Sequence, residues 1–228
     1  MKIGILECGR LPDDMSAKTG QYPPMFMRLL DGHGFSFKAW HVEAMAFPAS
    51  VTEADGWLIT GSRHGVYEDH AFIPVLEQFI RDAFAAHVPV VGICFGHQIM
   101  AQALGGRVEK YAGGWVVGAQ DYDFDSGPVR LNAWHQDQVI TPPKGAQTVA
   151  RNAACAHAAL HYPGHGFSVQ AHPEFEDRVI QGLIDHRGPG VVPDAQLHDA
   201  QAGLGHANSA RVADRIAVFY KQHAGLRI

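Results

Sequence analysis

Residues 88–98 of the chain read Val-Pro-Val-Val-Gly-Ile-Cys-Phe-Gly-His-Gln. The apolar run predicts a buried strand, and a helix is expected over residues 97–104, so Cys94 falls on a tight turn between them. Gly92 and Gly96 flank this turn and allow a backbone path that a Cβ atom would obstruct. A thiol at the positive N-terminal end of a helix is stabilised as its thiolate. We therefore expect Cys94 to be a nucleophile that attacks a carbonyl carbon.

The composition is that of an ordinary globular protein, with 228 residues of which 46% are hydrophobic and 18% charged. We expect one domain over residues 1–228, with a core at about 1–186 and a C-terminal helical extension at about 187–228. The net charge of −5 and the lack of a basic run argue against nucleic acid or a membrane surface as a partner. No apolar stretch approaches the ~20 residues of a membrane span. Three scattered cysteines indicate a reducing cytoplasm.

The first half of the chain alternates strand-like and helix-like segments. Strands are expected at residues 2–8, 35–40, 56–60 and 88–93, helices at 25–30, 72–86 and 97–104, and a polar loop at 9–21. This order is typical of an α/β fold, in which helices cover a parallel sheet and the site lies at the carboxyl ends of the strands. Cys94 directly follows such a strand end.

The second half of the chain has a different character. Short strand-like pieces at 107–110, 115–118, 129–132 and 147–150 predict antiparallel hairpins appended to the parallel core. A further strand at 167–171 runs into His172-Pro173-Glu174. Helices at 176–186 and about 209–223 are expected to close the chain, the last one covering the core, with a Pro/Gly-rich insert between them.

A cysteine nucleophile needs a base and a third group that holds the base. His172 and Glu174 are two residues apart on an extended segment, so their side chains leave the backbone on the same side. A carboxylate beside an imidazole fixes the ring tautomer and stabilises the imidazolium. Because His172 lies 78 residues after Cys94, the two meet only if both strands end at the same edge of one sheet.

Fifteen histidines raise the question of a metal site. His157, His161 and His165 recur every four residues, which on a helix places them on one face, but Pro163-Gly164 would break that helix. The sequence also lacks a His-Glu-x-x-His motif and Cys/His ligand pairs. We therefore expect surface and packing histidines, and no metal.

The residues quoted above resemble the class I glutamine amidotransferases. Gly92-Ile-Cys-Phe-Gly-His-Gln98 matches the Gly-x-Cys-x-Gly-x-Gln nucleophile turn of that family, and His172-Pro-Glu174 matches its His-Pro-Glu segment. The resemblance covers roughly residues 1–186. It implies a flavodoxin-like fold with a mixed, mostly parallel central sheet flanked by helices, and a small appended antiparallel sheet.

The resemblance also implies roles for individual residues. Cys94 matches the family's nucleophile, His172 its general base and acid, and Glu174 the residue that orients the histidine. The Thr60-Gly61-Ser62 turn resembles the family's oxyanion loop, in which the N–H groups of Gly61 and Phe95 would bind the oxyanion. Three further residues are expected to bind the substrate. Gln98 matches the motif glutamine that helps hold the substrate side chain in the family, and Ser62 directly follows the oxyanion glycine. His135 belongs to residues 134–139, which resemble a family segment that lies near the site.

The reaction implied by the resemblance is hydrolysis of the γ-glutamyl amide of glutamine or a related compound. A thioester on Cys94 would form and release ammonia or an amine, then glutamate, with no metal or organic cofactor. One interpretation is a glutaminase that feeds an unseen synthetase subunit. The other is a free-standing γ-glutamyl peptidase that acts on peptides or conjugates, which gains a little from Tyr22, Met25 and the loop at 63–67 as a pocket wall.

Each prominent residue also has a plainer interpretation. Cys94 might have been a core cysteine, or the oxidisable group of a redox sensor or a non-catalytic binding protein, but His172 and Glu174 together argue for catalysis. His135 is expected to shape the pocket by hydrogen bonding rather than to act as a second base. The other prominent residues are not expected to be catalytic. His97 is expected to be a surface or helix-start residue, and Cys8 and Cys155 to be inert thiols. Arg63 and His64 are expected to be exposed loop charges.

Overall fold

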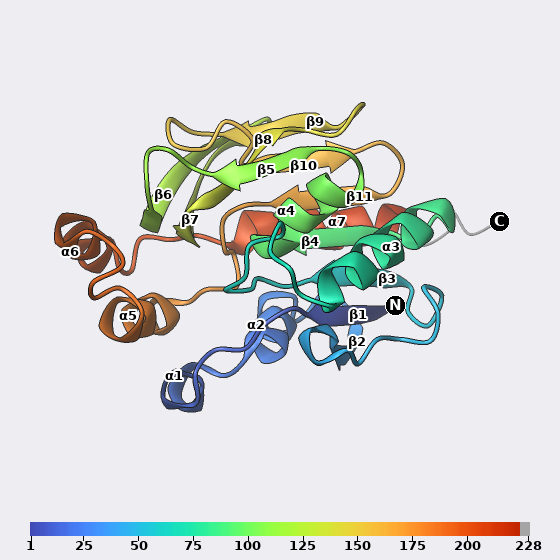
Figure 1. The fold of residues 1–228 in the computed structure, drawn as a ribbon, viewed down its shortest axis with the longest axis horizontal. Coiled ribbons are helices and arrows are strands. Elements are labelled where there is room, and N and C mark those ends of the chain that lie inside the picture. The colour runs from blue at the N-terminus through green and yellow to red at the C-terminus, as the bar shows by residue number, and fades with distance from the viewer. Residues whose placement is uncertain (224–228) are drawn as a thin grey trace.

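A nine-stranded sheet forms the centre of the computed structural model, which describes residues 1–223 (Figure 1). The strand order is β2-β1-β3-β4-β11-β10-β9-β6-β7. In chain order these strands are β1 (Lys2–Glu7), β2 (Ser36–His41), β3 (Gly56–Ile59), β4 (Val90–Ile93), β6 (Val116–Phe124), β7 (Gly127–His135), β9 (Gln147–Arg151), β10 (Ala159–Tyr162) and β11 (Gly166–Val169). A separate antiparallel sheet pairs β5 (Arg107–Lys110) with β8 (Asp137–Thr141).

The sheet changes character along its width. Neighbouring strands from β2 to β11 run parallel, whereas β11, β10, β9, β6 and β7 pair antiparallel. The predicted α/β fold, with a mixed central sheet and a small antiparallel sheet beside it, is therefore confirmed. Most of the predicted hairpin strands do not form that small sheet. They extend the central sheet at one edge instead.

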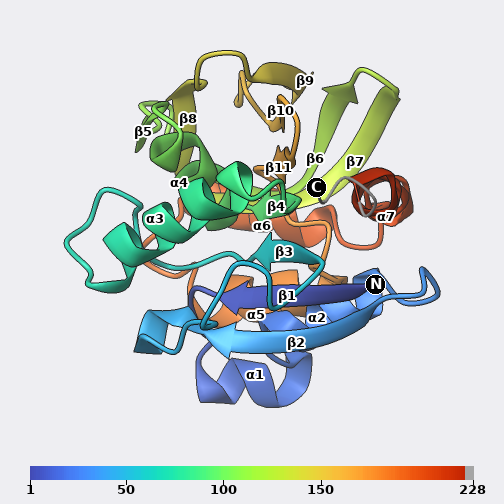
Figure 2. The same cartoon turned by 90° about the vertical axis from the view of Figure 1, so that its right-hand side faces the viewer.

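Helices cover both faces of the sheet (Figure 2). Helices α3 and α4 lie on one face with the short 3-10 helix η1, and α2, α5 and α7 lie on the other. The helices are α1 (Asp13–Thr19), α2 (Tyr22–Leu29), α3 (Phe72–Ala85), α4 (Phe95–Ala103), α5 (Asp177–His186), α6 (Asp194–Ala202) and α7 (Ala210–His223), and η1 spans Val42–Ala44. No helix of the described chain is long and apolar enough to cross a membrane.

The central strand β4 explains why residues 88–93 form an unbroken apolar run. Val91 and Ile93 pack on the side of α2 and α7, while Val90 packs on the side of α3 and α4. All three are buried, since helices cover both faces of a parallel sheet. This burial fixes the register of β4 and hence the position of the turn that follows it.

The last helix, α7, covers the sheet as expected. Tyr220 is fully buried, and its hydroxyl donates a hydrogen bond to the carbonyl oxygen of Trp57 in β3 at 2.8 Å. Ile216 and Phe219 on the same face are also buried. Residues 224–228 of the predicted extension lie outside the described residues.

The polar loop predicted at residues 9–21 is wrong, because it contains α1. Asp13 and Asp14 lie in the first turn of this helix and Lys18 in its last, which suits the helix dipole. Only Met15 and Thr19 are buried, so a seven-residue helix produces no readable periodicity. The same reason applies to α6, which follows the Pro/Gly-rich insert and was not predicted.

Candidate active site

Cys94 lies at the turn between β4 and α4, and α4 begins at Phe95, two residues before the predicted start. Its φ of 54° and ψ of −103° are unusual for a residue with a side chain, and such strain costs about 1–3 kcal/mol. A Cβ atom on Gly92 would lie 2.3 Å from the carbonyl oxygen of Gly96, and one on Gly96 would lie 2.3 Å from that of Ile59. The close backbone contacts around the cysteine therefore require both glycines.

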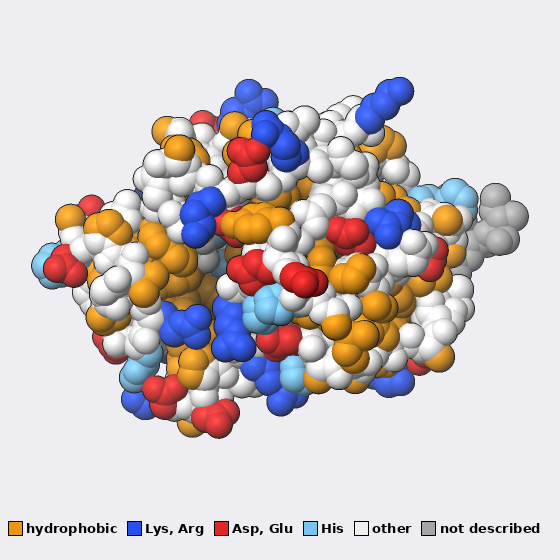
Figure 3. Space-filling model, viewed as in Figure 1, with side chains coloured by type: hydrophobic (Ala, Val, Ile, Leu, Met, Phe, Trp, Pro, Cys, Tyr) orange, Lys and Arg blue, Asp and Glu red, His pale blue; other side chains and the backbone are white. Residues whose placement is uncertain are grey.

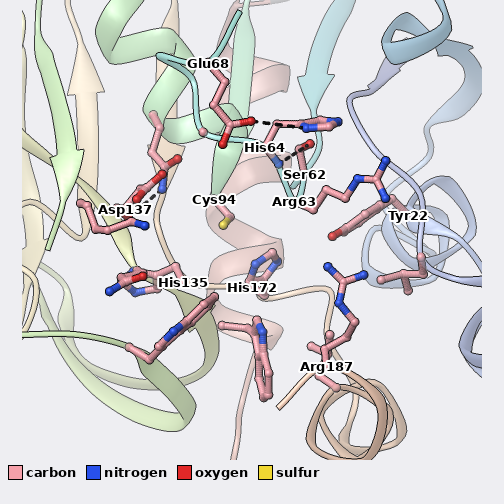
Figure 4. Close-up of a pocket in the computed structure, with 18 of the residues that line it drawn as sticks. Tyr22, Ser62, Arg63, His64, Glu68, Cys94, His135, Asp137, His172 and Arg187 are labelled. Carbon is pink, nitrogen blue, oxygen red and sulfur yellow. Dashed lines mark hydrogen bonds and ion pairs between the residues drawn. The ribbon is translucent and has the colours of Figure 1, made fainter. Parts of the chain in front are cut away.

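His172 and Glu174 come together with Cys94, as the sequence predicts. Nδ1 of His172 lies 2.7 Å from Oε1 of Glu174, both side chains are buried, and the ring lies beside the cysteine (Figure 4). Burial alone lowers the pKa of His172, but the negative charges of Glu174 and of the Cys94 thiolate outweigh it and raise the pKa to about 10. The raised pKa therefore keeps the His172 ring as an imidazolium at neutral pH.

Aromatic packing holds the His172 ring in place. The ring stacks on Phe175 with centroids 3.8 Å apart and an interplanar angle of 2°, and Phe175 in turn stacks on Tyr22 at 6.1 Å. A Cβ atom on Gly61 would lie 2.9 Å from Cε1 of His172. The imidazole is thus confined between an aromatic ring and a glycine, which limits its rotation.

The predicted oxyanion donors lie next to the nucleophile. Ile59 and Gly92 are paired in register, so Gly61 and Cys94 each lie two residues beyond a paired position on adjacent strands. Phe95 is the first residue of α4, where a backbone N–H has no acceptor within the helix. Both positions suit the predicted role, which remains a prediction.

Gln98 lines the pocket, but other protein groups already bind its amide. Its Nε2 donates to the carbonyl oxygen of Asp137 at 2.8 Å and to Oε1 of Gln170 at 3.2 Å. Nε2 of Gln170 lies 3.7 Å from the sulfur of Cys94. The sequence analysis did not single out Gln170, although it precedes His172 by two residues on the same extended segment.

Ser62 and His135, the other predicted substrate residues, both line the pocket. The Ser62 hydroxyl accepts a hydrogen bond from the N–H of His64 at 3.2 Å. His135 is buried, and neither of its ring nitrogens has a hydrogen-bond partner in the part of the chain that the structure describes. Burial and the nearby charge of His172 lower the pKa of His135 to about 3, so its ring is neutral and free to donate or accept one hydrogen bond.

These side chains surround a cavity of about 240 Å³ (Figure 4). Figure 3 shows Lys and Arg side chains beside hydrophobic ones on this face of the molecule. The wall of the cavity comes from segments far apart in the sequence, among them Tyr22, Arg63, Trp115, Trp134 and Arg187. Arg187 and Trp115 carried no recognisable signal in the sequence, because they join the pocket only through the tertiary fold, whereas Trp134 belongs to the segment 134–139 that was expected near the site.

Two histidine predictions need correction. His97 lies at the start of α4, as one of its two predicted placements has it, but it is fully buried rather than at the surface. Its Nδ1 lies 2.7 Å from Oγ of Ser168, and burial lowers its pKa to about 3. His64 is only 12% exposed, and its Nε2 lies 2.7 Å from Oε1 of Glu43. Each ring forms a polar contact with a side chain that is buried or mostly buried. A sequence pattern does not reveal such contacts.

The other secondary predictions agree with the structure. Arg63 is 61% exposed, as expected of a loop charge. Cys8 and Cys155 are buried, and burial raises the pKa of each thiol, that of Cys155 to about 12. A thiol with so high a pKa is almost fully protonated at neutral pH, which makes it a poor nucleophile.

Cys94 thus lies at the end of a central parallel strand, beside a buried His172-Glu174 pair that follows the neighbouring strand. A model of the glutamine amidotransferase class-I family matches residues 27–182. The chain belongs to this family.

Relatives of known sequence include both free-standing proteins and parts of larger ones. A glutamine amidotransferase-like protein of Schizosaccharomyces pombe is 29% identical over 87% of this chain and 89% of its own length. Gamma-glutamyl peptidase 4 of Arabidopsis thaliana is 28% identical over 76% of each chain. A glutamine-hydrolyzing GMP synthase of Chromobacterium violaceum is 31% identical over 76% of this chain, which spans only 33% of that enzyme.

The fold also matches solved structures. A glutamine amido transferase from Methylobacillus flagellatus superposes with a TM-score of 0.76 over 98% of this chain and 94% of its own, at 20% identity. A glutamine amidotransferase from Thermotoga maritima superposes with a TM-score of 0.74 at 18% identity. At such identities the superpositions establish the fold of the whole described chain.

Proposed function

We propose that the protein is a cysteine hydrolase that cleaves γ-glutamyl amides through a thioester on Cys94. The observation that carries the proposal is the buried His172-Glu174 pair beside the strained cysteine. The imidazolium form of His172 keeps the sulfur as a thiolate, the form that attacks a carbonyl. The strand-end positions of Cys94 and His172 open both residues to the cavity, and Glu174 lies buried behind the histidine.

In the first step the thiolate of Cys94 attacks the γ-carbonyl carbon, and the carbonyl oxygen becomes an oxyanion. The N–H groups of Gly61 and Phe95 are the proposed donors to this oxygen, and one such donor contributes about 3 kcal/mol in comparable sites. His172 then gives its proton to the leaving nitrogen, the C–N bond breaks, and ammonia or an amine departs. A γ-glutamyl thioester remains on the sulfur.

In the second step a water molecule replaces the amine. His172, now neutral, takes a proton from the water as its oxygen attacks the thioester carbon. The C–S bond breaks, glutamate leaves, and the thiolate-imidazolium pair is restored. Glu174 holds the ring through Nδ1 in both steps, so that Nε2 serves the reacting atoms.

A second candidate substrate is a γ-glutamyl peptide rather than glutamine, and the arginines of the pocket favour it. Arg63 and Arg187 extend on the same side of the cavity as Tyr22 (Figure 4). Within residues 1–223 no carboxylate forms an ion pair with Arg187. A γ-glutamyl peptide carries two carboxylates, one on the glutamyl group and one on the leaving group, whereas glutamine carries one.

The relatives support both candidates. Gamma-glutamyl peptidases match this chain over most of their length, whereas a GMP synthase matches it over a third. If glutamine is the substrate, we propose that a separate synthetase subunit takes up the ammonia. We also propose that residues 1–228 act as one domain in the cytoplasm, without nucleic acid or a membrane as a partner.

The test of the proposed function is hydrolysis of glutamine and a panel of γ-glutamyl dipeptides, with glutamate release as the readout. Cys94→Ala should abolish release, and mass spectrometry should find a γ-glutamyl group on the wild-type peptide that contains Cys94. Cys155→Ala is the matched control, because it removes a thiol outside the pocket and should retain activity. Turnover by Cys94→Ala would overturn the assignment of the nucleophile.

Substitution of Arg187 distinguishes between the two candidate substrates. Arg187→Gln should raise KM for a γ-glutamyl dipeptide about tenfold, from the ~1.5 kcal/mol of a hydrogen bond to a charged group. It should change KM much less for the same dipeptide with an amidated C-terminus. Arg178→Gln, which removes a surface arginine from the first turn of α5, the helix that Arg187 follows, is the control. Equal effects on both dipeptides would favour glutamine as the substrate.

A further inference from the structure

A cluster of His64, Glu68 and His70 lies in the loop between β3 and α3. One ligand atom from each of the three lies within 4.8 Å of the others. Oε2 of Glu68 is 2.9 Å from Nε2 of His70 and 3.6 Å from Nδ1 of His64. In a tetrahedral zinc site, bonds of about 2.0–2.1 Å place neighbouring ligand atoms about 3.3 Å apart. The two spacings from Oε2 of Glu68 bracket that value.

A further carboxylate orients the first of these ligands. Nε2 of His64 lies 2.7 Å from Oε1 of Glu43. In the tautomer that donates Nε2–H to Glu43, Nδ1 carries a lone pair directed toward Glu68. Histidine ligands of metals generally donate their other ring N–H to such a carboxylate, which fixes the tautomer and raises the basicity of the ligand.

The loop also holds the cluster in place without a metal. The N–H of Glu68 donates to the carbonyl oxygen of Gly65 at 3.1 Å, and that of His70 donates to the carbonyl oxygen of Glu68 at 3.1 Å. The buried ring of Phe72 lies behind both imidazoles, with centroids 5.8 Å from His64 and 6.1 Å from His70. An apolar group behind the ligands and solvent in front of them is the setting of an open, accessible metal site.

We propose that Nδ1 of His64, the Glu68 carboxylate and Nε2 of His70 bind one divalent cation of the zinc class. The sequence analysis expected no metal because it examined the histidines at 157–165, whereas these ligands follow no familiar spacing. His64 and Glu68 also line the cavity that contains Cys94 (Figure 4), so the ion occupies its wall. Three protein ligands leave a fourth position for water or for a carboxylate of a bound ligand.

The experiment measures metal binding directly and does not depend on the proposed hydrolysis. Metal-free protein in the Cys94→Ala background, which removes the reactive thiolate as a competing ligand, is titrated with Co²⁺ at pH 7.5 by visible absorption and with Zn²⁺ by calorimetry. We expect one ion per chain, with the absorption bands of a tetrahedral cobalt site. Adding His70→Ala should abolish this binding, and adding Glu43→Gln should weaken it about 10- to 100-fold.

Two controls keep the result specific. His206→Ala removes an exposed histidine elsewhere and should leave the binding unchanged. His165→Ala disrupts the other close histidine contact, in which Nδ1 of His87 lies 2.6 Å from Nε2 of His165, and should also leave it unchanged. Thermal unfolding without metal checks that each variant is folded. Binding that survives His70→Ala, or that is lost in His165→Ala instead, would overturn the proposal.

Discussion

Glu174→Gln tests the buried charge pair, because it keeps the shape of the side chain and removes its charge. The pKa of His172 rises from its ordinary value of 6.5 to about 10 in the folded protein. Each pKa unit corresponds to about 1.4 kcal/mol. At pH 7 the folded pKa lies about three units above the pH, so the raised pKa adds about 4 kcal/mol to the free energy of unfolding at that pH. Cys94 supplies part of that shift, and the expected loss for Glu174→Gln at pH 7 is therefore about 3 kcal/mol.

The sign of the pH dependence follows from the direction of the shift. A histidine with a raised folded pKa contributes its full stabilisation below pH 6.5 and loses it as the pH rises through about 10. The difference in free energy of unfolding between wild type and Glu174→Gln should therefore shrink steadily from pH 6.5 to pH 9.5. Urea denaturation across this range measures it.

The matched control for this experiment is Glu176→Gln. Glu176 lies two residues further on and pairs with Arg28 at 2.9 Å, but both side chains are more than 40% exposed. An exposed pair contributes at most about 1 kcal/mol. A loss for Glu174→Gln that is no larger than this, or that is the same at pH 6.5 and pH 9.5, would refute the charge-pair reasoning.

Three further predictions concern other parts of the molecule. Gly61→Ala should lower kcat about 100-fold, because its Cβ atom would displace the His172 ring, and glutamate release measures this. An unchanged kcat would contradict the close contact. Tyr220→Phe should lower the free energy of unfolding by about 1–3 kcal/mol and leave kcat unchanged, since it leaves the Trp57 carbonyl without its hydroxyl donor. A denaturation curve equal to that of the wild type would contradict this prediction. His135→Phe should raise KM and leave the ionisations in the pH-rate profile between pH 5 and 8 unchanged, because His135 is neutral throughout that range. Loss of an ionisation from this profile would assign His135 a role as a base.

The arrangement around Cys94 was predictable because its signals are local. A cysteine between two glycines after an apolar run specifies a strand, a turn and a helix, and the alternation of elements specifies a parallel sheet. His172 and Glu174 were also predictable, since two residues on an extended segment share a side whatever the rest of the fold does. The structure brings both groups to one edge through the pairing of β4 with β11.

The walls of the pocket were not predictable, for a physical reason. Arg187 follows a helix whose position depends on packing against α1 and α6, and Trp115 precedes β6, which lies between β9 and β7 far from β4 in the sheet. Neither has a local partner in the sequence. His97 was expected at the surface or at the start of the helix, and it does lie at the start of α4, but the packing of that helix buries it beside Ser168.

The backbone at Cys94 has a consequence for how stability and activity are related in this protein. A positive φ at a residue with a side chain costs conformational free energy, and the packing of the surrounding sheet and helix keeps Cys94 in this conformation. Glycine adopts that conformation freely, so Cys94→Gly should unfold at a higher temperature than Cys94→Ala although both are inactive. Cys94 thus occupies a position where selection for folding alone would favour glycine, and the chemistry proposed for its thiol supplies a reason for the residue found there.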